Sequence, residues 1–306
     1  MEFCDIFLRN DSYFSAFSSS LGGTCFHLEY KKDVSVLRGV QSVKDYYINP
    51  YICGNPLLFP PNRIKDGTFE FNNRKYCFPI NDKLTNCHLH GMLYNRAFKI
   101  IEHTFNKVTF LYRANSNEYM GFPHAFEICR QYILGNDGLT ENTSCKNLSS
   151  EIMPFMLAYH TTFNVSICKP RERRYLKTNI DYEILRDQHY LPTGQYAYNS
   201  NKIDELRSGR YLLGEANYSA FYKSSGTKVE IINFDKGYNV VYETDRRFGY
   251  KMLYEVKEKG FVSIEPQTCS IDCFHLQGSP DSYGMIALMP KEKIILSTKI
   301  YVVDNQ

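Results

Sequence analysis

Residues 86–91, Asn-Cys-His-Leu-His-Gly, carry two histidines at alternating positions. In a strand this spacing places His88 and His90 on one face, where two imidazoles could bind zinc or one imidazole could act as an acid near neutral pH. Zinc is the weaker interpretation, because no HExxH motif or second Cys/His pair completes a tetrahedral ligand set. Strand histidines are also common as ordinary core or surface residues. A chemical role and a purely structural role therefore both stay open for this segment.

A glutamate and a third histidine offer further acid–base chemistry. Glu265 ends the apolar run of residues 261–264 and precedes Pro266. Because proline cannot extend an interior ladder, we expect this carboxylate at an exposed sheet end. Partial desolvation there would raise its pKa and make it a competent base near neutral pH, whereas a solvated strand-end glutamate is the alternative. His160 lies between apolar runs in residues 158–164, Ala-Tyr-His-Thr-Thr-Phe-Asn.

Arg63 is a candidate ligand-binding residue. It follows two prolines and precedes a turn glycine in residues 58–67, Leu-Phe-Pro-Pro-Asn-Arg-Ile-Lys-Asp-Gly. A rigid backbone behind a planar guanidinium suits the binding of oxygen-rich ligands. The alternative is an ordinary arginine of a surface loop.

Strands must position these side chains, because the hydrophobic pattern has a period of two. Residues 68–71 and 74–78, separated by Asn72-Asn73, predict a hairpin with a tight turn. The 25 Tyr and 21 Phe also favour strands over helices. We therefore expect an all-β fold of two large packed antiparallel sheets. The same alternation predicts strands at residues 107–113, 228–232, 239–244, 261–265 and 294–303.

The organisation along the chain is simple. Helix is expected only in short pieces, such as residues 122–134, and the polar residues 135–150 predict a long surface loop. Strand-like segments of the same composition lie on both sides of that loop. We therefore predict one domain over residues 1–306, since all-β sandwiches often exceed 200 residues as a unit.

Charge and composition exclude several classes of protein. A formal net charge of +3 with scattered basic residues gives no electrostatic footprint for nucleic acid. No stretch approaches 18 uncharged apolar residues, and Glu2 and Asp5 stand where a signal peptide would be basic. We therefore expect a cytoplasmic protein without a membrane partner. Its ten cysteines are then expected to be reduced and mostly buried.

Taken in order, these segments resemble the aldose 1-epimerase (galactose mutarotase) family. The motifs are Asn-Arg-Ile followed by Gly, Leu-His-Gly, His-x-x-Phe-Asn, and a late strand ending in Glu with Gln two residues on. Leu-Pro-Thr-Gly at residues 191–194 and Asp-Glu-Leu at 204–206 match further elements, so the resemblance spans about residues 55–303. It is similar to a diverged bacterial mutarotase-like branch. The resemblance implies a β-supersandwich that interconverts the α and β anomers of a free aldose without cofactor or metal.

Site roles follow from the matching motifs. The resemblance makes Glu265 the general base that removes the C1 hydroxyl proton and His160 the acid that protonates the ring oxygen, with His90 assisting. His88 matches no catalytic position of the family. A monosaccharide is the implied partner of a monomer or homodimer. Residues implied to bind or surround the sugar are Asn62, Arg63, Phe163 and Gln267.

One departure from the family concerns sugar binding. Many mutarotases carry an Asp-His-x-Phe-like segment whose Asp grips sugar hydroxyls, whereas residues 217–221 here read Asn-Tyr-Ser-Ala-Phe. Galactose is therefore not assumed to be the substrate. A hexose-6-phosphate 1-epimerase is the runner-up, with the basic residues 169–174 as a phosphate cradle. A non-catalytic carbohydrate-binding or sensing protein on the same fold is the third reading.

Overall fold

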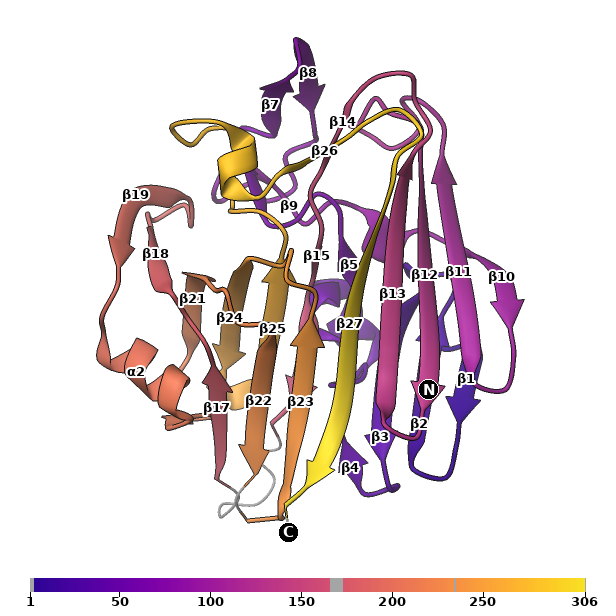
Figure 1. Cartoon of the computed structure of the whole chain (residues 1–306), viewed down its shortest axis with the longest axis vertical. Helices are drawn as coiled ribbons and strands as arrows, with labels where there is room; N and C mark the ends of the chain where they lie inside the picture. The colour runs from indigo at the N-terminus through magenta and orange to yellow at the C-terminus, as the bar shows by residue number, and fades with distance from the viewer. Residues whose placement is uncertain (1–2, 166–172, 234, 306) are drawn as a thin grey trace.

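The computed structural model describes residues 3–165, 173–233 and 235–305, and most of its regular structure is strand (Figure 1). The predicted all-β fold of large antiparallel sheets is confirmed. A nine-stranded sheet has the order β10 (Lys99–His103), β11 (Lys107–Ala114), β12 (Phe126–Gly135), β13 (Gly138–Asn147), β27 (Lys293–Asp304), β23 (Tyr238–Thr244), β22 (Lys228–Asn233), β17 (Arg174–Thr178) and β20 (Tyr211–Leu212).

Two further sheets and three ribbons complete the strands of the described residues. An eight-stranded sheet has the order β19 (Pro192–Ala197), β18 (Tyr182–Arg186), β21 (Tyr218–Lys223), β24 (Tyr250–Val256), β25 (Phe261–Gln267), β15 (Ala158–Tyr159) and β5 (Leu57–Leu58), with β16 (Thr161–Asn164) also paired to β25. A four-stranded sheet contains β1 (Ile6–Arg9), β2 (Tyr13–Ser18), β3 (Thr24–Tyr30) and β4 (Val34–Ser35). The ribbons pair β6 (Arg63–Lys65) with β9 (Cys87–Leu89), β7 (Thr68–Phe71) with β8 (Arg74–Cys77), and β14 (Met153–Phe155) with β26 (Ile286–Leu288).

Helices in the described part of the chain are short. The α-helices are α1 (Val43–Ile48) and α2 (Asn201–Ser208), and the 3-10 helices are η1 (Pro50–Ile52), η2 (Leu93–Asn95), η3 (Lys257–Lys259) and η4 (Pro280–Tyr283). Each α-helix begins after a serine whose side chain accepts a backbone N–H bond, which is the preferred N-cap arrangement. None of the described helices is long and apolar enough to cross a membrane.

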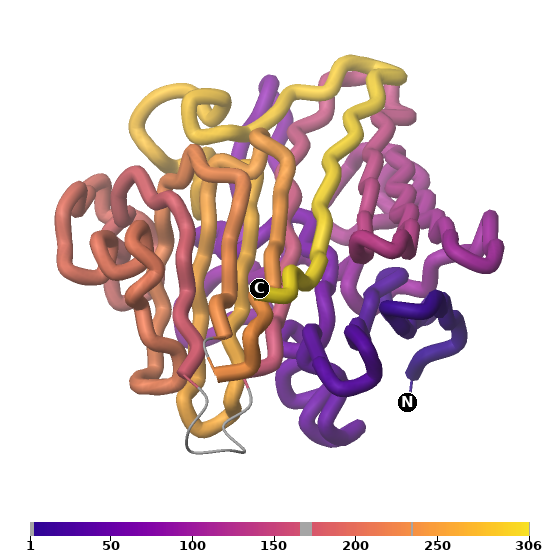
Figure 2. The backbone as a smooth tube through the Cα atoms, turned by 60° about the horizontal axis from the view of Figure 1, so that its bottom comes forward, coloured from indigo at the N-terminus to yellow at the C-terminus, as the bar shows by residue number. Residues whose placement is uncertain are grey.

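Both smaller sheets pack against the nine-stranded one. The C-terminal strand β27 lies at the middle of that sheet, between β13 and β23, and Figure 2 shows its yellow trace between the orange and magenta parts of the chain. From the four-stranded sheet, Phe17 packs on Tyr132 with ring centroids 4.7 Å apart. From the eight-stranded sheet, Phe163 packs on Tyr242 at 5.5 Å. The aromatic excess therefore fills the space between the layers, where such side chains bury large apolar areas.

Two local expectations from the sequence are wrong. The helix expected at residues 122–134 is mostly strand β12, in which buried and half-buried residues alternate along the whole length. The loop expected at residues 135–150 is mostly β13, which pairs with β12 and with β27. The polarity of β13 misled the prediction, because Glu141 lies inside and binds the buried Arg130 at 2.7 Å.

The other strand predictions hold. The hairpin forms as β7 and β8 with Asn72 and Asn73 at positive φ, and strands occupy all five other predicted segments. The cysteines of the described residues are free, and six of them are buried: Cys25, Cys53, Cys87, Cys145, Cys269 and Cys273. A single domain over residues 1–306 stays a prediction.

Candidate active site

Side chains on one face of the eight-stranded sheet build the floor of a cleft. Glu265 of β25 stands opposite Met252 of β24, and two residues along, Ser263 stands opposite Tyr254. Tyr254 in turn stands opposite Ser219 of β21. Because alternate residues of a strand point to the same face, these neighbouring rows share one surface. The cleft is lined by Glu265, Met252, Tyr254 and Ser219.

His160 reaches this surface through a break between β15 and β16. The first of these strands pairs with β25 at Gln267, and the second pairs with it from Ile264 onward. His160 lies in the gap, opposite Glu265, and its backbone N–H donates to the carbonyl of Pro56 at 3.0 Å. The break therefore lets the His160 side chain leave the regular ladder while the His160 backbone stays hydrogen-bonded.

The expectation of an exposed sheet end at Glu265 is wrong. Glu265 is only 2% exposed, and Pro266 lies within β25, opposite Lys251 of β24. The proline is accommodated beside the break between β15 and β16, where the ladder of hydrogen bonds is already interrupted. The carboxyl is therefore desolvated far more completely than a strand end would allow.

Glu265 and His160 form a close buried pair. The imidazole Nε2 lies 3.2 Å from the carboxyl Oε1. Burial raises the pKa of Glu265 to about 8, although Arg186, Arg63 and Gln267 act in the opposite direction, and burial lowers the pKa of His160 to about 3. Between these pKa values the pair holds one proton, which belongs to the pair rather than to either residue. One proton donor and one proton acceptor thus lie side by side.

His90 approaches the pair from the turn that follows β9. Its backbone has φ 65°, and its N–H donates to the carbonyl of Asn62 at 2.9 Å. The next residue must be glycine, because a Cβ on Gly91 would lie 2.0 Å from the Phe59 carbonyl oxygen. Burial lowers the pKa of His90 well below its ordinary value, so this imidazole is neutral at physiological pH.

His88 has a different environment. Its Nδ1 lies 2.8 Å from the carbonyl oxygen of Pro79, and its ring packs 4.8 Å from that of Phe78. The expectation that His88 and His90 share one strand face is wrong, because β9 ends before His90 and the positive φ redirects that side chain. His88 is a buried core histidine.

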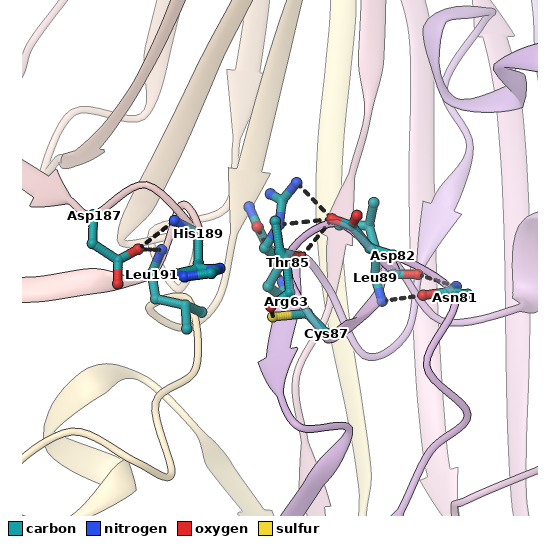
Figure 3. Close-up of polar contacts among 10 residues, drawn as sticks. Arg63, Asn81, Asp82, Thr85, Cys87, Leu89, Asp187, His189 and Leu191 are labelled. Carbon is teal, nitrogen blue, oxygen red and sulfur yellow. Dashed lines mark hydrogen bonds and ion pairs between the residues drawn. The ribbon is translucent and has the colours of Figure 1, made fainter.

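Arg63 is oriented by an acidic partner behind it (Figure 3). Its Nε and Nη2 lie 3.1 and 3.0 Å from Oδ2 of Asp82, and Thr85 donates to the same oxygen at 2.8 Å. The guanidinium carbon lies 4.7 Å from the ring centroid of Tyr190. This arrangement keeps the arginine extended along the cleft wall with its charge balanced.

The cleft has a volume of about 290 Å³, close to the lower end of the range of small-ligand sites, about 300–1,000 Å³. It brings together five of the residues implied by the resemblance, Asn62, Arg63, His90, His160 and Glu265. Tyr51 packs on His90 with ring centroids 4.6 Å apart. The walls thus combine oxygen-binding groups with aromatic faces, a combination suited to a sugar ring.

Two of the implied residues do not line the cleft. Phe163 is buried and packs on Tyr242 in the core between the sheets. Gln267 is also fully buried, but its side chain faces Glu265 and lowers the pKa of that carboxyl. In this structure Phe163 therefore supports the layer behind the site, and Gln267 lies behind Glu265 rather than in the cleft lining.

Sequence reasoning missed several lining residues, chiefly Arg186, Tyr190 and Tyr51. Arg186 is the last residue of β18, and Tyr190 lies at φ 61° in the turn that follows. The Asp187 carboxylate shapes that turn by accepting the backbone N–H groups of His189 and Leu191 at 2.8 and 3.0 Å (Figure 3). The available signal was the strand-end arginine followed by an Asp-x-His-x-Leu turn, which matched no motif.

His90, His160 and Glu265 also form a set able to hold a metal ion, because one donor atom from each lies within 4.8 Å of the others. Two histidines and a carboxylate match the three-ligand set of some catalytic zinc sites. This set differs from the His88 and His90 pair considered from the sequence. The same three atoms can instead share protons directly, as the 3.2 Å contact between His160 and Glu265 shows.

Comparison with known proteins identifies the family of the chain. A family model described as aldose 1-epimerase matches residues 5–301. The chain belongs to the aldose 1-epimerase family. A galactose mutarotase-like protein from Clostridium acetobutylicum superimposes with a TM-score of 0.90 at 27% identity, covering 97% of this chain and 94% of that one. Galactose 1-epimerase from Lactobacillus acidophilus NCFM gives a TM-score of 0.73 at 16% identity, with 98% and 94% covered, which shows the shared fold.

A relative by sequence is the uncharacterized protein YihR of Escherichia coli K12. It is 25% identical over 237 residues, which are 72% of this chain and 71% of that protein. The galactose mutarotase-like fold and the family are therefore as the sequence motifs implied. Within this fold the cleft of the eight-stranded sheet collects the residues that the motifs single out.

Proposed function

We propose that this protein is an aldose 1-epimerase that interconverts the α and β anomers of a free aldose. The observation that carries the proposal is the buried contact of 3.2 Å between His160 and Glu265 in a cleft lined by Asn62 and Arg63. Ring opening needs one group to take a proton and another to give one, both near neutral pH. A cytoplasmic location and a monosaccharide partner belong to the same proposal.

The proton movements balance over one catalytic cycle. Transfer of the shared proton across the contact of 3.2 Å gives the reacting form, a Glu265 carboxylate beside a His160 imidazolium. The carboxylate removes the proton of the C1 hydroxyl, the electron pair of that O1–H bond forms the C1=O1 double bond, and the C1–O5 bond breaks with its electron pair going to O5. The imidazolium gives its proton to O5, with His90 at the edge of the pair. After rotation about C1–C2, O5 attacks the other face of the aldehyde and both protons return. No net proton is gained or lost, and no redox step occurs.

The pH dependence follows from the shared proton. The raised pKa of Glu265, about 8, marks loss of the single proton, so the active form is present below this pH and is lost as the pH rises through it. We expect kcat/KM to stay level between about pH 5 and 7 and to fall about tenfold per pH unit above about 8. Polarimetry with the uncatalysed rate subtracted measures this, and circular dichroism checks the fold. A rate that rose through pH 8 would show that the fully deprotonated pair is the active form.

The activity itself is tested with freshly dissolved α-aldoses. Purified protein is expected to accelerate their optical relaxation in polarimetry, and EDTA is expected to leave the rate unchanged because the chemistry uses only protons. A panel of hexoses and pentoses covers the free sugars. If every sugar bound but relaxed at the uncatalysed rate, the chain would be a sensor rather than an enzyme.

The phosphate cradle expected at residues 169–174 stays a prediction. The basic run at residues 169–174 lies largely outside the described residues. Within it, Arg173 pairs with Asp235 at 3.7 Å, and neither Arg173 nor Asp235 lines the cleft. A free aldose is therefore the substrate favoured by the motifs, and any charged substituent on it has to be recognised by groups within the cleft.

A further inference from the structure

Arg186 enters the cleft from β18. Of the strands that build the cleft floor, β18 lies farthest from Glu265. The pairing of β18 with β21 ends where Ile184 stands opposite Phe221, and Arg186 follows two residues later as the last residue of β18. The Arg186 Nη2 donates to the backbone carbonyl of Ser219 at 2.8 Å and to its hydroxyl at 3.0 Å. These bonds fix one edge of the guanidinium against β21 and leave its other donors to the cleft, which Arg186 lines.

The charges of the cleft do not balance at Arg186. Arg63 is matched by Asp82 at 3.0 Å, and Glu265 is engaged with His160. Among the described residues no carboxylate forms an ion pair with Arg186. Burial, reinforced by Arg63, lowers the pKa of Arg186, and Glu265 and Glu183 offset this only in part. A half-enclosed guanidinium without an anion is unfavourable, so the site is built to receive one.

The position of the Arg186 guanidinium suits a substituent at the end of a sugar that lies opposite C1. Three strand spacings of about 4.8 Å separate β18 from β25, or roughly 14 Å between the backbones. Arg186 and Glu265 both line the cleft and interact electrostatically. The ring of Tyr190 lies between the two arginines, 4.7 Å from Arg63 and 5.6 Å from Arg186. One pyranose can therefore place its C1 at Glu265 and its opposite end at Arg186.

We propose that the substrate is an acidic aldose, whose anionic group binds Arg186 while its C1 faces Glu265 and His160. The proposal rests on the proposed epimerase activity and names its substrate class. Ser219 holds the Arg186 guanidinium through Nη2, and no ion pair with a described residue neutralises its charge. A planar guanidinium is suited to a carboxylate or a phosphate.

The test compares acidic and neutral sugars of matched configuration. Anomer exchange is measured by NMR magnetisation transfer for D-glucuronic acid, D-glucose 6-phosphate and D-glucose, and binding is measured separately by calorimetry on the Glu265→Gln variant. We expect kcat/KM and affinity for at least one acidic sugar to exceed those for glucose by at least about tenfold. The acidic sugar that gains identifies the anion as carboxylate or phosphate.

Arg186→Met is expected to reduce this preference to near unity, whereas Arg113→Met, at an exposed arginine paired with Glu127, is expected to preserve it. Equal or better turnover of glucose by the parent enzyme would overturn the acidic substrate and leave the epimerase intact. Binding of an acidic sugar that depends on Arg186, without acceleration of any sugar, would uphold anion recognition and overturn the epimerase. A preference that survived Arg186→Met would assign the anion to another group and overturn the role of Arg186.

Discussion

Replacing Glu265 by glutamine is expected to lower kcat/KM for anomer exchange by at least about 100-fold. General acid–base groups typically contribute factors of about 100 to 10,000, and glutamine keeps the size of the side chain while removing its ability to take a proton. The carboxyl lies 3.2 Å from the imidazole of His160, so the variant also removes the acceptor with which that imidazole shares its proton. Polarimetry on a sugar that the parent enzyme accelerates gives the rate, and calorimetry gives the affinity.

The control separates lost chemistry from lost structure. In the folded protein the pKa of Glu265 is raised to about 8 from 4.5, so between these values the folded state binds the extra proton and its stability falls as the pH rises. Glutamine removes this loss, and Glu265→Gln is therefore expected to melt at an equal or higher temperature than the parent at pH 8. Glu258→Gln, at an exposed glutamate of η3, should change neither rate nor melting. Near-parental activity of Glu265→Gln would contradict its role as the base.

Much of the fold could be predicted from the sequence where apolar and polar residues alternate along a strand that buries one face. Strands such as β22 and β27 show this alternation clearly, and both were predicted. The prediction failed at β13, because the polar groups on its inner face, among them Glu141 and Thr143, bind one another and Arg130 inside the core. Hydrophobicity alone cannot distinguish such a paired polar strand from a surface loop.

Only those residues of the candidate site that lie in recognisable motifs could be predicted from the sequence. Each of His90, His160 and Glu265 sits in a short segment that resembles the family, whereas Arg186 belongs to no such segment. Its place in the cleft depends on the register of β18 with β21, which two-residue periodicity does not determine. The same limit explains Phe163, which was expected beside the sugar but packs on Tyr242 between the sheets. Cross-strand register is thus the information that the linear pattern lacked.

A buried ionic network supports the site from behind. Arg130 binds Glu141 at 2.7 Å and the carbonyl of Asn55 at 3.0 Å, and the Asn55 amide donates to the other Glu141 oxygen at 2.8 Å. The next residue, Pro56, accepts the backbone N–H of His160. The network therefore fixes the segment on which His160 is held.

Glu141→Gln is expected to lower the free energy of unfolding by about 3–5 kcal/mol, because it leaves the fully buried Arg130 charge without its counterion. Urea unfolding at pH 7 measures the loss. Glu127→Gln removes an exposed pairing with Arg113 and should cost no more than about 1 kcal/mol. The double variant Arg130→Met with Glu141→Leu removes both charges and should recover most of the stability. A loss for Glu141→Gln as small as that of the control would show that the network is not essential to the core. A large loss would show that the core depends on the ion pair between β12 and β13.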